Sequence, residues 1–211
     1  EVLEAGGVSE INQALSIALP SFNFPRPALN DGTDTIRPAT LRGLGPDQTL
    51  VLVNSKRRHA ASLVNVNGSI GRGSAAVDMN TIPTAAISAI EVLRDGASAQ
   101  YGSDAIAGVI NVRLREASSG GNVTASYGQR ETSYDVPTNP FPTNLGLPAA
   151  PSTISRDRSD GQTSTVSGWI GLPLFTEAGF LTVSAEYKHQ EHTERSGYDT
   201  RQQYAFISGS P

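Results

Sequence analysis

The sequence predicts an α+β layer in its first half, followed by antiparallel strands that each have one apolar and one polar face. Two observations predict the first part: four short apolar runs with strand character, and small helical segments that end at proline or glycine. A third predicts the second part, where apolar and polar residues alternate with a period of two. The composition changes near residue 117, so we expect one domain over 1–117 and another over 118–211.

A helix is expected at the start of the first domain. Ser9 suits the N-cap position and Glu10 suits the positively polarised first turn. Pro20 ends the helix, and residues 21–35 form a loop. One helical face then carries the apolar residues Ile11, Ala14, Leu15, Ala18 and Leu19.

Strands alternate with turns through the rest of this domain. Strand signals occupy about 36–42 and, most strongly, 49–53, with a tight turn at Asn54–Ser55 leading back through 56–58. Residues 59–80 are a long, polar, glycine-rich loop without secondary structure, and such loops are often functional.

The last part of the domain contains two more strands. Ile82–Pro83 leads into a helical turn, and the third strand covers 90–94. A second helical turn, Ser98–Tyr101, stops at Gly102, because glycine favours helix C-termini. The fourth strand covers 108–112.

Three strands are expected in the second domain, at about 122–134, 163–174 and 180–190. A short connection at 175–179 and a long, proline-rich one at about 130–161 are typical of outer-membrane barrels, which have short periplasmic turns. The pattern fits an antiparallel sheet of a soluble protein equally well. Three strands cannot close a barrel, so we expect disorder or pairing between molecules at their edges.

Composition excludes several classes of site. The chain has no cysteine, which excludes disulfides and cysteine metal sites, and its net charge of -4 gives no indication of a nucleic-acid partner. No stretch approaches the roughly 20 apolar residues of a membrane-spanning helix. The N-terminus carries no signal peptide, and we expect the chain to be a fragment of a longer protein.

Four segments of the first domain resemble, in order, the plug of TonB-dependent outer-membrane receptors. They are 41–45 (LRGLG), 49–54 (TLVLVN), 78–83 (DMNTIP) and, above all, the ungapped run 90–112 (IEVLRDGASAQYGSDAIAGVINV). The resemblance covers about residues 8–115. Ser55 stands where the family usually has glycine, so we expect a looser turn or another turn type there.

The resemblance implies an α+β plug with a mixed four-stranded sheet, followed by the first strands of a transmembrane β-barrel of about 22 strands, whose wide lumen needs a stopper. It implies a nutrient transporter of the Gram-negative outer membrane, taking a ferric siderophore, a carbohydrate or cobalamin. It also implies coupling to TonB through a Ton box upstream of Glu1, with no cofactor and no catalytic role.

Candidate site residues follow from the same resemblance. Arg42 and Arg94 resemble the family arginines that face carboxylates of the barrel wall, and the alternative is surface pairing with Glu91 or Asp95. The outward loops at 21–35 and 59–78 are expected to bind the ligand. Their hydrogen-bonding side chains are Asn23, Arg26, His59, Asn65, Asn67 and Arg72.

Two rival functions have weaker support. The glycine-rich run 68–74 lacks the Lys-Ser/Thr ending of a phosphate-binding loop, and no apolar strand immediately precedes it. His189 and His192 lie three apart on a strand and so face opposite sides, which argues against a metal-dependent enzyme. A soluble periplasmic binding module with a plug-like fold remains the main alternative.

Overall fold

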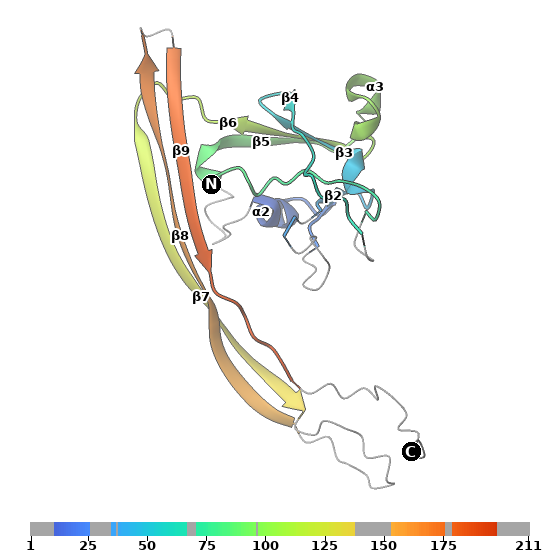
Figure 1. Cartoon of the computed structure of the whole chain (residues 1–211), viewed down its shortest axis with the longest axis vertical. Coiled ribbons are helices and arrows are strands. Elements are labelled where there is room, and N and C mark those ends of the chain that lie inside the picture. Colours follow the sequence, from blue (N-terminus) through green and yellow to red (C-terminus); the bar gives the residue numbers. More distant parts are fainter. Residues whose placement is uncertain are drawn as a thin grey trace. The chain divides into compact units, whose positions relative to one another are not determined.

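The computed structural model describes residues 11–25, 35–36, 38–66, 71–95, 97–137, 153–175 and 179–197. Short elements fill residues 11–114 and three long strands follow them (Figure 1). The short elements are α2 (Ile11–Ala18), β1 (Phe22–Asn23), β2 (Thr40–Leu41), η1 (Pro46–Gln48), β3 (Thr49–Val53), β4 (Lys56–Arg57), η2 (Thr84–Ala86), β5 (Ile87–Leu93), α3 (Ser98–Tyr101), η3 (Ser103–Ala105) and β6 (Gly108–Leu114). The long strands are β7 (Gly121–Pro137), β8 (Thr153–Leu174) and β9 (Gly179–Gln190).

The mixed four-stranded sheet is confirmed, but the strand expected at 36–42 is not part of it: β2 pairs with β1 in a separate sheet, and β4 is the fourth strand. Its order is β4-β3-β6-β5, with β3 and β6 parallel and the outer pairs antiparallel. The central parallel pair runs in register from Thr49 beside Gly108 to Val53 beside Val112. Parallel strands covered on both faces are apolar throughout, which explains the continuous run TLVLV in β3.

Alternate residues of β3 and β6 enter two hydrophobic clusters, one on each face of the sheet. Val51, Ile110 and Val112 pack with α2, while Leu50, Leu52 and Val109 pack with Ala97 and Ala105. Figure 1 shows α2 below the sheet strands.

Helix α2 confirms the predicted first helix and its apolar face. Ile11, Ala14 and Leu15 are buried, whereas Ala18 at the helix end is exposed. Ser9 and Glu10 lie outside the described residues.

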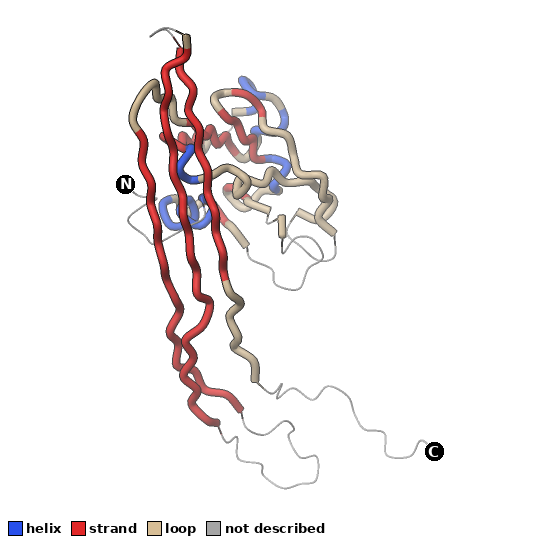
Figure 2. Tube along the Cα trace, turned by 60° about the vertical axis from the view of Figure 1, so that its left-hand side comes forward, coloured by secondary structure: helices blue, strands red, loops and turns tan. Residues whose placement is uncertain are grey.

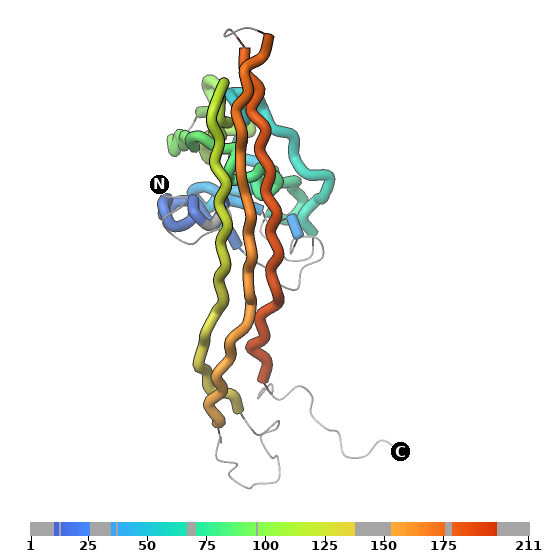
Figure 3. Tube along the Cα trace, turned by 90° about the vertical axis from the view of Figure 1, so that its left-hand side faces the viewer, coloured from blue at the N-terminus to red at the C-terminus, as the bar shows by residue number. Residues whose placement is uncertain are grey.

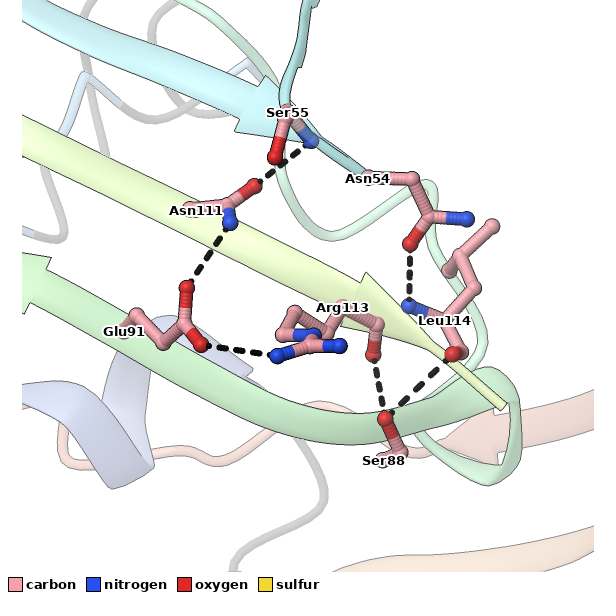
Figure 4. Close-up of polar contacts among 7 residues, drawn as sticks. All are labelled: Asn54, Ser55, Ser88, Glu91, Asn111, Arg113 and Leu114. Carbon is pink, nitrogen blue, oxygen red and sulfur yellow. Dashed lines mark hydrogen bonds and ion pairs between the residues drawn. The ribbon is translucent and has the colours of Figure 1, made fainter. Parts of the chain in front are cut away.

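The tight turn predicted at Asn54–Ser55 is confirmed, and Ser55 does not loosen it. Asn54 and Ser55 both adopt positive φ, 48° and 64°, as a two-residue type I′ hairpin requires. Asn54 Oδ1 accepts from Leu114 N at 2.8 Å, and Ser55 N donates to Asn111 Oδ1 at 3.0 Å (Figure 4). These hydrogen bonds from the end of β6 hold the serine in a conformation that glycine adopts at less cost.

Two other local expectations were wrong. The strand expected at 36–42 is only two residues long, because Arg42 and Gly43 turn the chain with φ values of 58° and 72°. The region 59–80 is not structureless where it is described: Val64 and Ala75 form an antiparallel bridge, and Asn65 N donates to Ser74 O at 2.9 Å. Met79, at the end of this region, is fully buried and packs in the hydrophobic core, so it brings the chain back to the sheet.

The three long strands form one sheet in the order β7-β8-β9 and lie side by side (Figure 2, Figure 3). β8 begins at Thr153, about ten residues before the predicted start, because its first part is polar on both faces and gives no alternation signal. The strands are formed within a single chain, and pairing between molecules stays a prediction. No helix in the described part of the chain is long and apolar enough to cross a membrane.

The chain divides into two compact units, residues 1–124 with 166–187 and residues 125–165 with 188–211. The first unit therefore contains the four-stranded sheet together with one segment of each long strand. In the second unit, Asp160 on β8 accepts hydrogen bonds from Glu194 N and Arg195 Nη1, at 2.9 and 2.5 Å.

Candidate functional site

Arg42 and Arg94, which are expected to face carboxylates of the barrel wall, line one pocket of about 340 Å³ with Ser21 and Asp95. Arg42 follows β2 and Arg94 follows β5, so strand ends from two different sheets meet here. Arg42 Nη1 donates to Arg94 O at 3.1 Å, and Arg42 N donates to Ser21 O at 2.7 Å. These hydrogen bonds hold Arg42 at its positive φ. As a result, two cationic side chains line the same pocket.

Glu91, the surface partner considered for these arginines, is engaged elsewhere. Its carboxylate accepts from Asn111 Nδ2 at 2.9 Å and from Arg113 Nη1 at 3.2 Å, both on β6 (Figure 4). The hydrogen bond from Asn111, then that from Arg113, lowers the pKa of Glu91 below its ordinary value. Among the described residues, Arg42 and Arg94 form no ion pair, so their charges are not neutralised within this part of the chain.

The candidate ligand-binding residues do not share that pocket. Asn23, His59 and Arg72 are exposed, as a ligand-contacting role requires. Asn65 is only 2 % exposed, and its Nδ2 has no partner, so this side chain lies inside the 59–78 region rather than on its surface. Arg26 and Asn67 lie outside the described residues.

Sequence reasoning missed a set of contacts between the first domain and the long strands. Thr84 N and Thr84 Oγ1 both donate to Glu186 Oε2 on β9, at 3.0 and 2.5 Å. The Thr182 hydroxyl on the same strand accepts from Ala117 N at 3.0 Å and lies 3.3 Å from Ala117 O. Thr182 and Glu186 belong to the polar set of the predicted alternation, and that period was the signal available for finding them.

Strand β9 and the second half of β8 expose their apolar residues, and β9 partly covers the polar residues between them, whereas β7 is exposed on both faces over residues 121–133. On β9, Leu181, Val183 and Tyr187 are 43 %, 49 % and 68 % exposed, while Thr182, Ser184 and Glu186 are half-buried. On β8, Val166, Ile170, Leu172 and Leu174 are exposed as well. Among the described residues, both hydrophobic clusters are built without any residue of β7, β8 or β9.

This arrangement is opposite to that of a water-soluble sheet, which turns its apolar face to a core. A transmembrane barrel strand carries apolar side chains on the lipid side and polar ones on the lumen side. The described residues place no group of three or more His, Asp or Glu where they could hold a metal ion, and His189 instead hydrogen-bonds Glu191 at 2.9 Å.

In a comparison with known families, the family described as TonB-dependent Receptor Plug Domain matches residues 1–109. Among curated proteins, the chain is 31% identical over 139 residues to a probable TonB-dependent siderophore receptor, PirA, of Acinetobacter baumannii. That alignment covers 65% of this chain and 18% of the relative. Over 94 residues it is 34% identical to the ferric enterobactin receptor PirA of Pseudomonas aeruginosa, covering 44% of this chain and 12% of that protein. The chain thus spans less than a fifth of these relatives.

Solved structures show a similar fold. The ferric enterobactin receptor PfeA in complex with BCV-L6 aligns with a TM-score of 0.54 and 22% identity, over 86% of this chain and 22% of that one. A point mutant of PfeA from Pseudomonas aeruginosa in complex with enterobactin aligns with a TM-score of 0.50 and 23% identity, over 83% of this chain and 22% of that one.

Proposed function

Because the chain belongs to the family of TonB-dependent receptor plug domains, we propose that it is part of a larger receptor that imports a small nutrient across the outer membrane of a Gram-negative bacterium. In this proposal residues 1–117 are the plug and residues 118–211 are the first strands and an outer loop of the barrel wall. The protein binds and transports its cargo and is not an enzyme.

One observation carries the proposal. Over residues 166–174 of β8 and 180–187 of β9 the exposed residues are apolar, while the polar residues Thr182 and Glu186 of β9 contact the plug. A strand of a barrel wall has apolar side chains toward the lipid and polar side chains toward the hydrated interior, and this division of residues meets both requirements. A soluble binding module would leave the same apolar side chains in water at a cost of about 25 cal/mol per Å².

A ferric siderophore is the cargo that we propose, ahead of a carbohydrate or cobalamin. Two of the curated relatives reported above are named for siderophores, one of them for ferric enterobactin. The loop residues Arg26, His59 and Arg72 offer cationic or hydrogen-bonding groups for an anionic chelate. Asn23 and Asn67 add amide groups, and the buried Asn65 supports the loop from inside.

The two arginines of the pocket are proposed to hold the plug in the barrel by facing carboxylates of the wall. Their lack of an ion pair within the described residues leaves them available for such partners. Charged hydrogen bonds of this kind are strong yet reversible, which suits a stopper that has to move. Energy would come through TonB, captured by strand addition at a Ton box upstream of Glu1.

Uptake measurements test the cargo. A strain lacking the receptor gene should lose uptake of radioiron-loaded enterobactin but keep uptake of cobalamin and maltodextrin, and the intact gene should restore it. Arg72→Ala should weaken binding about tenfold, which corresponds to about 1.4 kcal/mol. Lys56→Ala, a matched loss of one exposed cation on β4, should leave binding unchanged. If the deletion instead abolished only cobalamin uptake, and the intact gene restored it, the siderophore assignment would be refuted.

Two further experiments test the location and the arginines. Detergent, but not high salt, should release the full-length receptor from outer membranes, whereas release by salt would favour the soluble module. The double variant Arg42→Ala with Arg94→Ala should loosen the plug and raise leakage of a hydrophilic dye into the periplasm. Lys56→Ala is again the control, and equal leakage in both strains would contradict the proposed plug–wall contact.

A further inference from the structure

Four residues of β8 and β9 lie on one face of the long strands and contact the first domain. Trp169 and Gly171 are two positions apart on β8, and Thr182 and Glu186 are four positions apart on β9. Because successive residues of a strand point to opposite faces, each pair lies on a single side of its strand. We call these four residues the docking face. They contact residues beside the start of β5 and just after the end of β6.

Glu186 holds the turn that leads into β5. Its Oε2 accepts hydrogen bonds from Thr84 N at 3.0 Å and from Thr84 Oγ1 at 2.5 Å. Thr84 begins η2, and its carbonyl oxygen accepts from the N–H of Ile87, the first residue of β5. Hydrogen bonds to an ionised acceptor are about twice as strong as neutral ones. One carboxylate on β9 therefore fixes both the turn and the start of the strand that follows it.

Arg115, directly after β6, ties the same turn to β8. Its backbone N–H donates to Ala86 O at 2.7 Å, and its guanidinium donates to Ala85 O at 3.4 Å and Ile87 O at 3.2 Å. The guanidinium also lies 4.6 Å from the ring centroid of Trp169, a cation–π contact. Two of the long strands thus hold the η2 turn, one through a carboxylate and the other through an aromatic ring.

The linker between β6 and β7 passes directly over Gly171. This glycine is buried, and its N–H donates to Gly120 O at 2.9 Å. A Cβ atom at this position would lie 2.6 Å from Ala117 O and 2.7 Å from Ala117 Cβ, so the close approach of the linker requires glycine. The Thr182 hydroxyl accepts from Ala117 N at 3.0 Å. The docking face therefore holds the linker as well as the turn.

All these contacts lie within one compact unit. We propose that the docking face is a second plug–wall contact, which positions the plug in the barrel together with the arginine pocket, and that Glu186 is its positioning residue. Ile87 and Leu93 are six positions apart on β5, about 20 Å at roughly 3.3 Å per residue, and Arg94 of the pocket follows Leu93. Sites more than about 10 Å apart contribute nearly additively, so the two contacts hold the plug independently. The inference rests on the proposed transport function, but the docking contacts are measurable without transport.

Dye leakage through the full-length receptor tests whether the docking face holds the plug. Glu186→Leu should raise leakage about threefold, because it removes the charged acceptor for two hydrogen bonds. Glu186→Gln keeps an acceptor oxygen and should remain close to the parent. When Glu186→Leu is combined with Arg42→Ala and Arg94→Ala, the separate increases should multiply.

Two results would overturn the proposal: parent-level leakage in Glu186→Leu, or leakage in the combined variant no greater than in the arginine variant alone. If the arginine variant itself did not leak, the proposed role of the pocket would be wrong, and Glu186→Leu alone would still decide this inference.

Hydrogen–deuterium exchange of the purified full-length receptor measures the docking contacts directly. Glu186→Leu should raise exchange at residues 84–87 about tenfold, the loss expected for a hydrogen bond to a charged group, without changing exchange in β3. Gly171→Ala is a second, independent variant and should raise exchange at Ala117, because the added methyl group displaces the linker. Gly128→Ala on β7 is its matched control, since a Cβ atom there meets nothing within 4 Å.

Unchanged exchange in both Glu186→Leu and Gly171→Ala would refute the docking face. If Glu186→Leu also raised exchange in β3, the loss would be general rather than local, and Gly171→Ala against Gly128→Ala would decide. A parent receptor that transports no cargo would refute the proposed function and leave these exchange measurements intact.

Discussion

The four-stranded sheet and the three-stranded sheet use apolar residues in opposite ways. In the first, Val51, Ile110 and Val112 are buried against α2 and the returning chain. In the second, Val183 and Ile170 are about half exposed, whereas Thr182 and Ser184, the polar neighbours of Val183, are partly buried. In the proposed receptor, the apolar side chains of the plug thus avoid the surrounding water, and those of the wall strands avoid the hydrated interior of the barrel. Alternation of apolar and polar residues predicts a strand, but only the burial of its apolar side chains shows which medium each face of the strand contacts.

Truncation of a plug core residue should have the largest effect. Ile110→Ala removes a fully buried side chain from the central strand and should destabilise the plug by about 2–5 kcal/mol, measured by denaturant unfolding. Ile106→Ala makes the same truncation at a side chain that is 46 % exposed and should cost much less. Equal costs would show that β6 is not the centre of a core.

A charge on the exposed face of β9 distinguishes lipid from water. Val183→Lys should cost about 2–4 kcal/mol if this face lies at the middle of the bilayer, because an ammonium group is poorly solvated there. Folding yield into lipid vesicles, followed by gel mobility, measures the loss. Ser184→Lys on the neighbouring polar face should fold better. If the face were exposed to water, Val183→Lys would change stability by only about 0.5 kcal/mol.

The hairpin turn of the plug offers a smaller, stabilising change. Ser55→Gly relieves a positive φ that costs an L-residue about 1–2 kcal/mol, and part of this gain is offset by the greater freedom of glycine in the unfolded chain. We expect a net gain of at most about 1 kcal/mol in thermal unfolding. Asn111→Ala should act in the opposite direction, since it removes the acceptor for Ser55 N.

The smallest effect concerns pH and Glu91. A carboxyl whose pKa is lower in the folded state stabilises the fold above its unfolded pKa of about 4.3, and this contribution disappears as pH falls through the folded value. Glu91→Gln should therefore flatten the acid limb of the plug's stability curve while leaving neutral behaviour nearly unchanged. An unchanged acid limb would mean that the contacts with Asn111 and Arg113 do not persist in solution.

Local chemistry predicted most of the plug. The run 49–53, the positive-φ turn after it and the stop at Gly102 depend on neighbouring residues, so the sequence alone locates them. The hydrogen bonds that tighten the turn at Ser55 come from β6 and are invisible locally. The bridge between Val64 and Ala75 was missed because neither flank has a strong strand pattern.

The candidate site was predicted unevenly for a similar reason. Arg42 and Arg94 line one pocket, but their contact with carboxylates of the wall stays a prediction, and the burial of Asn65 depends on how a glycine-rich segment folds back. The contact between Thr84 and Glu186 joins residues 102 positions apart, which no local pattern specifies. The early start of β8 was missed because polar residues occupy both of its faces there.

The parallel pairing of β3 with β6 also sets the order in which the plug is made. Leu114 reaches back sixty positions to Asn54, and the central ladder cannot begin until the chain beyond residue 108 has emerged. Closing so long a loop costs entropy before any contact rewards it, so native sheet formation is slow. Until then the apolar run of β3 has only the short strand β4 as its sheet neighbour. The sheet of the plug is therefore complete only once β6 is present, directly before the first long strand, β7, in the chain.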